Sequence, residues 1–348
     1  MAITFAENYR KAVLFDHPEW IPMTFHINPA CWNHYDHSEL QDLMASHPKL
    51  FPNFKPQPRV HPVYEVNQWK DHPYTDPWGC TWTTESDGIT GSVTGHPLKT
   101  WGDFIHYPSP DPDKTNGLIP MDWDKLNKEM VQAKKAGGLA CAGLPHGHTF
   151  LRLCDMRGYE NLMFDMADEE PLLWDLISLN ENFNLALIER YLRAGANFIS
   201  YAEDLGMQVG PMLSPDHFRT YIKPSYQKLM APAQKAGAVI HMHSDGDIRL
   251  LVDDMLECGI QVLNCQDLVN GLDWIADNLL GRVCIDLDID RQLITHRGSP
   301  QDIDKLIREE VTKLARPSGG LTMIYGLYPG VPRENVKALM DAMERYMN

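Results

Sequence analysis

Short apolar runs alternate with longer amphipathic segments from about residue 121 to the end of the chain. The apolar runs contain few charges and often follow a glycine, which is typical of buried parallel strands. They predict strands at 137–144, 196–203, 238–243, 261–266, 282–289 and 320–327. The segments between them predict helices at 160–193, 215–235, 248–258, 272–279, 300–314 and about 332–346. Ser214 before Pro215 and Ser299 before Pro300 are typical helix starts.

The first third of the chain is less regular. It predicts one early strand at 20–25, followed by a histidine-rich connection at 26–37, and an eighth strand is expected near Leu118 or within the loop region. Strand–helix alternation over this length favours a closed (β/α)8 TIM barrel over a doubly wound sheet, which would need a GxGxxG motif after its first strand. We therefore expect one barrel domain over residues 1–348. Residues 53–117 are too long and proline-rich for an ordinary loop, and we interpret them as an insertion that caps one barrel end.

The amino-acid composition excludes some classes of binding partner and indicates the cellular compartment. The 348 residues include 31 Lys and Arg against 47 Asp and Glu, giving a formal net charge of −16, which argues against nucleic acid and anionic membranes as partners. A hydrophobic fraction of 43% excludes a disordered chain. The sequence has no long apolar run, no signal-peptide pattern and no CxxC pair among its seven cysteines. We expect a cytoplasmic protein without a disulfide framework.

Polar residues follow nearly every predicted strand. The active site of a TIM barrel lies at the carboxyl ends of its strands, so these residues are the candidates for chemistry. They are His26 and Asn28, His146 and His148, Glu203 and Asp204, His241, His243 and Asp245, Gln266 and Asp267, Asp286, Asp288 and Asp290, and Tyr325.

A metal site is the sharpest hypothesis that these residues suggest. His241, His243 and Asp245 share one face of a strand because side chains alternate with period two. With Glu203 at the end of the neighbouring strand, imidazoles and carboxylates could converge on zinc, and imidazoles favour zinc over magnesium. The alternative is that both histidines are hydrogen-bonded inner residues and that Asp245 belongs to a turn and helix cap.

Other candidates could bind substrate or have plain structural roles. His146 and His148 flank a glycine and are either binding residues or ordinary loop residues, while Asn28 and Asp204 are further candidates for substrate contact. Trp78 could wall an aromatic pocket, although a small core within the insertion is the favoured explanation. His26 and Tyr325 are candidate proton donors at strand ends.

Five motifs in order along the chain resemble the uroporphyrinogen decarboxylase superfamily. They are YAEDLGMQVGPMLSP (201–215), VIHMHSDGDI (239–248), GIQVLNCQD (259–267), CIDLDIDRQLI (284–294) and PGVPRENVKAL (329–339). The similarity extends over essentially the whole chain, including DPWGCTW, HPLKTWGDF and IPMTFHINPACW. It implies a (β/α)8 barrel and one of two activities, either decarboxylation of uroporphyrinogen or zinc-dependent, corrinoid-linked methyl transfer.

Departures from the family pattern point to one branch. True decarboxylases have an arginine-rich N-terminal stretch, whereas residues 21–35 contain neither arginine nor lysine. Thiol-methylating members hold zinc with a His-x-Cys-Gly element and a second cysteine. Here His243-Ser244-Asp245-Gly246 puts Asp245 in place of the first cysteine, and the second position falls near Tyr325. The chain is therefore most similar to the methyltransferase I component of anaerobic O-demethylases, of the veratrole or vanillate type.

This resemblance implies transfer of a methyl group from an aryl methyl ether to the cob(I)alamin of a separate corrinoid protein, with a phenol as product. Zinc held by Glu203 with His241, His243 or both, and with Asp245 as the weaker candidate, would bind the ether oxygen, or Tyr325 or His26 would protonate it. The chain lacks a DxHxxG corrinoid-binding element, so we expect cobalamin to arrive on a transient partner. Four alternative functions stay open: decarboxylation of uroporphyrinogen, methyl transfer from another donor, methyl transfer to a thiol acceptor, and a barrel without catalytic activity. The choice between a monomer and a homodimer also stays open.

Overall fold

The computed structural model describes residues 3–348, which divide into two compact units. The terminal unit comprises the chain up to Asp71, residues 84–90 and the chain from Cys265 onward. The central unit comprises His72–Thr83 and Gly91–Asn264. Strand β8 (Val262–Gln266) begins in the central unit and ends in the terminal unit.

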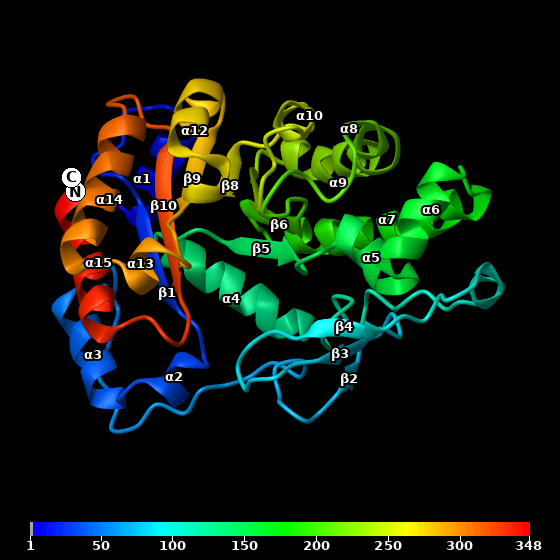
Figure 1. Cartoon of the computed structure of the whole chain (residues 1–348), viewed down its shortest axis with the longest axis horizontal. Helices are drawn as coiled ribbons and strands as arrows, with labels where there is room; N and C mark the ends of the chain where they lie inside the picture. Colours follow the sequence, from blue (N-terminus) through cyan, green and yellow to red (C-terminus); the bar gives the residue numbers. More distant parts are fainter. Residues whose placement is uncertain (1–2) are drawn as a thin grey trace. The chain divides into compact units, whose positions relative to one another are not determined.

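The terminal unit is built on three parallel strands, with β10 (Leu321–Leu327) hydrogen-bonded to both β1 (Met23–Ile27) and β9 (Cys284–Asp288). Helices α14 (Pro300–Leu314) and α15 (Arg333–Tyr346) pack against each other (Figure 1). The Ser299 side chain accepts a hydrogen bond from the Asp302 backbone, which confirms the expected start of α14. The remaining elements are α1 (Phe5–Val13), α2 (Cys31–His34), α3 (His37–Ser46), α11 (Asp267–Asn270), α12 (Leu272–Leu279) and α13 (Ile294–Arg297).

The central unit repeats this architecture. Its strands β5 (Cys141–Leu144), β6 (Phe198–Asp204) and β7 (Val239–Asp245) run parallel, and α7 (Pro171–Arg193) packs against α9 (Lys223–Lys235) and β5. The remaining elements here are α4 (Trp123–Lys135), α5 (Phe150–Arg157), α6 (Tyr159–Ala167), α8 (Pro215–His217), the π-helix η2 (Phe218–Ile222) and α10 (Val252–Leu256). The strand–helix alternation of both units is that of the (β/α)8 class, and all seven expected strands are confirmed.

Two of the expected helices are interrupted. The expected helix at 160–193 is two helices, because Glu169 adopts a positive φ of 54° and Pro171 starts α7 afresh. The expected helix at 215–235 starts as predicted, with the Ser214 side chain accepting from the His217 backbone, but it passes through η2 before α9 begins. Both interruptions occur at or near positions where proline prevents continuous α-helical hydrogen bonding.

Residues 53–117 are divided between the two units. In the central unit they form a small antiparallel sheet of β2 (Tyr74–Thr75), β3 (Thr81–Thr83) and β4 (Ser92–Gly95), followed by the 3-10 helix η1 (Trp101–Phe104). Within the described chain, Leu118 belongs to no strand, and Thr115 and Pro120 form an isolated bridge instead. That this insertion caps a barrel end stays a prediction.

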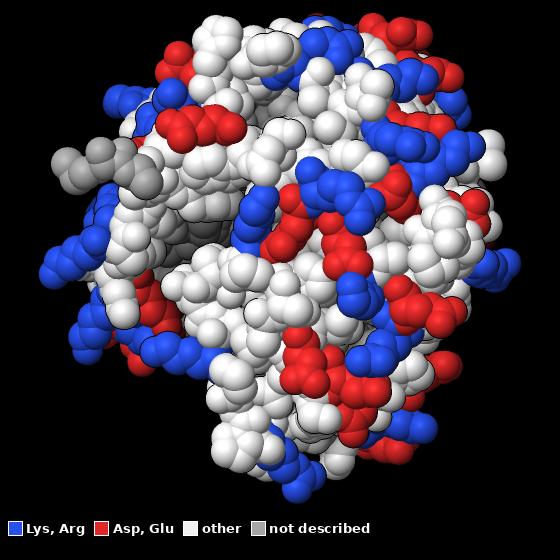
Figure 2. Space-filling model, turned by 90° about the vertical axis from the view of Figure 1, so that its left-hand side faces the viewer, with Lys and Arg blue, Asp and Glu red and all other residues white. Residues whose placement is uncertain are grey.

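Charged side chains of both signs are mixed on the molecular surface that Figure 2 shows. The negative excess of the chain is therefore not gathered into one acidic field on that face. Of the helices in residues 3–348, none combines the length and the apolar character that crossing a bilayer would require.

A buried ion pair holds the β2–β3 turn to helix α5. The guanidinium of Arg152 donates to Oδ2 of Asp76 at 2.7 Å, and the two residues are 2% and 4% exposed. Asp76 also accepts hydrogen bonds from the backbone of Trp78 and Cys80 and from the indole of Trp82. One carboxylate thus satisfies four donors, two of them in the turn that follows it and one on β3.

Replacing this carboxylate should destabilise the central unit strongly. We expect Asp76→Ala to lower the free energy of unfolding by about 3–5 kcal/mol, because it removes the close ion-pair partner of the buried Arg152 guanidinium and leaves it with the more distant Asp155 carboxylate at 3.9 Å. Removing the exposed Lys125–Glu129 pair with Glu129→Ala should cost less than about 1 kcal/mol. Denaturant unfolding followed by circular dichroism measures both variants, and equal effects would contradict the assigned role of Asp76.

Candidate active site

The carboxyl ends of β6 and β7 bring together the polar residues of the central unit. These strands pair in a register that sets Ala202 opposite His243 and Asp204 opposite Asp245. Opposed residues of neighbouring strands project from the same face of a sheet, and residues two apart share that face. Asp204, His243 and Asp245 therefore project to one side, away from the helix-covered face that Ile199 and Met242 fill.

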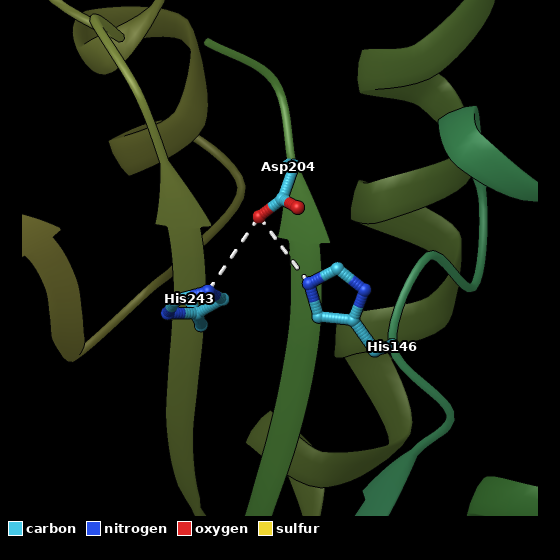
Figure 3. Close-up of side chains that lie close together, drawn as sticks. All are labelled: His146, Asp204 and His243. Atoms are coloured by element: carbon cyan, nitrogen blue, oxygen red, sulfur yellow. Dashed lines mark hydrogen bonds and ion pairs between the residues drawn. The ribbon is translucent and has the colours of Figure 1, made fainter. Parts of the chain in front are cut away.

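His146 completes this cluster from the loop after β5 (Figure 3). Oδ1 of Asp204 lies 3.2 Å from Nε2 of His146 and 3.5 Å from Nε2 of His243. Nε2 of His243 also lies 3.6 Å from Oδ1 of Asp245. The potential ligand atoms of His146, Asp204 and His243 all fall within 4.8 Å of one another, which is a separation that one metal ion could bridge.

The Asp204 carboxylate and the two imidazoles of the cluster stabilise one another's charged forms. Burial alone would raise the pKa of Asp204, but hydrogen bonds from His146 and His243 lower it well below its ordinary value. Burial likewise opposes protonation of His243, yet Asp204, Asp245 and Asn264 outweigh it and raise its pKa to about 9. The pKa of His146 is raised because its bond to Asp204 outweighs its burial. Without metal, an ionised carboxylate thus holds two imidazoles that favour the charged form.

Two glycines let the loops behind the cluster touch. Gly246 has a φ of +80°, and a Cβ atom there would lie 2.2 Å from the carbonyl carbon of Gly206. The backbone N–H of Gly206 donates to the carbonyl of Asp245, and that of Asp247 donates to the carbonyl of Met207. The loops after β6 and β7 therefore form one backbone-bonded layer that fixes Asp204 and Asp245.

Glu203 does not join this cluster, contrary to the sequence expectation. It pairs with Ser244 and is fully buried on the opposite face of β6. Its carboxylate accepts hydrogen bonds from the backbone of Thr149 and Phe150 at the start of α5 and from the hydroxyl of Tyr226. Burial raises the pKa of Glu203 to about 7. Asp204, expected to contact substrate, takes the place assigned to Glu203.

The two other expected ligands differ in their position. His241 projects from the same face of β7 as His243 but two residues earlier, where Nδ1 lies 3.1 Å from the Ser200 hydroxyl and the ring packs on Phe198. It is outside the group whose ligand atoms converge. Asp245 is the last residue of β7 and faces His243, and Asp247 accepts a hydrogen bond from the backbone of Arg249 in the following turn.

His148 and Trp78 do not lie in a position to meet a substrate. His148 is 2% exposed, between the rings of Tyr201 and Tyr226 on the helix side of β6. Trp78 is also 2% exposed and stacks edge-on against Phe183 of α7. Trp78 thus packs in the core of the central unit, which agrees better with the favoured structural explanation than with an aromatic substrate pocket.

The three remaining candidates lie in the terminal unit. The Tyr325 hydroxyl is buried and donates to the hydroxyl of Thr295 at 3.1 Å, and burial raises its pKa to about 12, which makes it a poor proton donor near neutral pH. His26 is exposed at the end of β1, and Asn28 follows it, with Oδ1 accepting from the backbone of Ala30. His26 and Asn28 keep their roles as predictions.

Asn264 was not among the residues expected from the sequence, and its Oδ1 is hydrogen-bonded to Nδ1 of His243. Asn264 is 4% exposed and lies on strand β8 between the apolar residues Leu263 and Cys265. A buried amide between apolar neighbours must find a hydrogen-bonding partner, so its position in the run VLNC was a usable signal.

The adjacent acids Glu203 and Asp204 provide a direct test of the site. We expect the wild type to bind about one zinc ion per chain and Asp204→Asn to lose most of it, because this substitution removes the anionic candidate ligand. Glu203→Gln should keep that zinc, since its side chain faces the start of α5. Metal analysis after dialysis against zinc distinguishes the two variants, and zinc loss in the Glu203 variant alone would contradict this assignment.

Comparisons with known proteins agree with the fold and define the family. A solved methyltransferase from Methanosarcina mazei superposes over 100% of both chains with a TM-score of 0.68 at 18% identity, which confirms the expected barrel class of fold. The methylcobamide:CoM methyltransferase MtaA of Methanosarcina barkeri is 27% identical over 256 residues, covering 68% of this chain and 70% of that protein. A uroporphyrinogen decarboxylase of Thermus thermophilus is 30% identical over 184 residues, 50% of this chain and 49% of that protein.

The family model of uroporphyrinogen decarboxylase (URO-D) matches residues 128–346. This stretch includes every residue of the cluster at the ends of β6 and β7, together with His146 and Asn264. The chain therefore belongs to the uroporphyrinogen decarboxylase family.

Proposed function

We propose that this protein is a corrinoid-dependent methyltransferase, which transfers a methyl group from an aryl methyl ether to cob(I)alamin carried by a separate corrinoid protein. The similarity to a methylcobamide:CoM methyltransferase over 68% of the chain supports the general activity. The electrostatics of the chain weigh against a polycarboxylate such as uroporphyrinogen, because its net charge is −16 and residues 21–35 contain no basic residue.

The observation that carries the choice of donor is the composition of the cluster. His146, Asp204 and His243, with Asp245 beside them, offer nitrogen and oxygen atoms and no sulfur. In thiol-methylating relatives, a cysteine stands where this chain has Asp245. Carboxylates and imidazoles are harder ligands than thiolates and leave zinc a stronger Lewis acid. Such a site suits activation of an ether oxygen better than activation of a thiol.

The donor set fits zinc, and in our proposal His146, Asp204 and His243 hold it. Zinc bound there would supply a Lewis acid for the ether oxygen of the substrate. Asp204 positions both imidazoles through its Oδ1 atom. The His146 side chain is 50% exposed and that of Asp245 37%, so a substrate can approach the cluster from that side.

The reaction balances without any redox reagent. The electron pair of Co(I) forms the new bond to the methyl carbon, and the carbon–oxygen bond breaks with its electrons left on the phenolate. Phenolate is a better leaving group when a positive charge lies beside its oxygen. The sequence contains no DxHxxG element, so we assign the cobalamin to a partner protein.

Turnover should require both the corrinoid and the histidine cluster. With a methoxyarene and reduced corrinoid protein, we expect methylcobalamin and a phenol in equal amounts, followed by absorbance and chromatography. His243→Ala should slow this reaction at least about 100-fold, because Lewis-acid stabilisation supplies several kcal/mol and about 1.4 kcal/mol is tenfold in rate. Ser200→Ala, which loses only the contact to His241, should stay near the wild-type rate.

The same experiment also tests the other activities known in the family. Turnover of uroporphyrinogen by the chain alone would contradict the proposal and assign a decarboxylase. Methylation of a thiol from methylcobalamin, without demethylation of any methoxyarene, would retain a corrinoid methyltransferase but overturn the aryl ether as methyl donor.

A further inference from the structure

We propose that Asn264 is a positioning residue, which fixes the tautomer and ring orientation of His243 so that Nε2 is presented to the metal. The inference rests on the proposed zinc site and goes beyond it, because Asn264 itself holds no metal in this account. Asn264 lies on β8 and His243 on β7, and both belong to the central unit.

The two nitrogens of the His243 ring have separate partners. Nδ1 is hydrogen-bonded to Oδ1 of Asn264, whereas Nε2 faces Asp204 at 3.5 Å and Asp245 at 3.6 Å. The Asn264 side chain therefore holds the ring from the end opposite to the carboxylates. A rotation that moved Nε2 out of the cluster would break the bond at Nδ1.

The amide oxygen also selects a protonation pattern. A ring that coordinates metal through Nε2 must keep its proton on Nδ1, and a carbonyl oxygen can only accept a hydrogen bond. Oδ1 of Asn264 thus favours the form with Nε2 available as a ligand. When metal displaces the Nε2 proton, His243 can no longer donate from Nε2 to Asp204 or Asp245. The hydrogen bond from Nδ1 to Asn264 can persist unchanged.

His241 provides the contrast within the same strand. Its Nδ1 lies 3.1 Å from the hydroxyl of Ser200. A hydroxyl can donate or accept, so Ser200 does not select one tautomer of His241. The acceptor-only contact occurs at His243, which is the histidine of β7 that belongs to the cluster.

Three variants test this role through zinc affinity rather than activity. Asn264→Leu keeps a similar side-chain size but removes the acceptor, and we expect zinc affinity to fall about 10–100-fold, the usual effect of losing a partner behind a metal ligand. Asn264→Asp retains an acceptor and should bind zinc at least as tightly as the wild type. Ser200→Ala is the matched control on His241 and should leave affinity unchanged.

Competition with a chromophoric chelator gives the zinc dissociation constants, and circular dichroism checks that each variant is folded. Nitrogen-15 NMR of the zinc-loaded wild type should show the His243 ring protonated at Nδ1. If Asn264→Leu does not fold, Asn264→Ala is held to the same expected loss of affinity.

Three outcomes would count against the inference. Wild-type zinc affinity in Asn264→Leu would overturn it and leave the zinc site standing. Equal loss in Asn264→Leu and Asn264→Asp would also overturn it, because an acceptor would then make no difference. A wild type that binds no zinc would overturn both the proposed site and the role of Asn264.

Discussion

The hydrogen-bonded register between β6 and β7 is the constraint on which the site depends. Because Ala202 lies opposite His243, the side chains of Asp204 and Asp245 project on the same face as the histidine. A shift of one residue would exchange Asp204 for Glu203 and bury the wrong carboxylate. The contact between Gly206 and Gly246 reinforces this register, since no larger residue fits where the two loops meet.

The same register gives two adjacent acids opposite roles. Glu203 accepts the first N–H groups of α5 and the hydroxyl of Tyr226, so it joins helices to the back of the sheet. Asp204 accepts from His146 and His243 on the other face, so it assembles the candidate ligands. Because side chains alternate along β6, the structural role of Glu203 and the candidate ligand role of Asp204 lie on opposite faces of one strand.

Much of the fold could be predicted because buried parallel strands leave a local signature. The apolar runs identified β6 and β7 to within two residues at either end, and Ser214 and Ser299 marked helix starts correctly. The break before Pro171 had a local signal as well, because a residue preceding proline is disfavoured in a helix.

The site was harder to predict because its geometry depends on pairs of strands. Periodicity placed His241, His243 and Asp245 on one face of β7, but it could not say whether Glu203 or Asp204 faced them. His148 was separated from His146 by a turn at Gly147, which places one ring in the cluster and the other in the core. Spacing within one segment does not fix either outcome.

In the proposed site, zinc is held by nitrogen and oxygen atoms at the ends of β6 and β7. Zinc-edge X-ray absorption on the zinc-loaded protein tests it directly, because ligand type sets the first-shell distance. We expect nitrogen and oxygen neighbours at about 2.0–2.2 Å, with imidazole scattering from two rings that is reduced in His146→Ala. A sulfur neighbour at about 2.3 Å would contradict the account and place the metal at a cysteine instead.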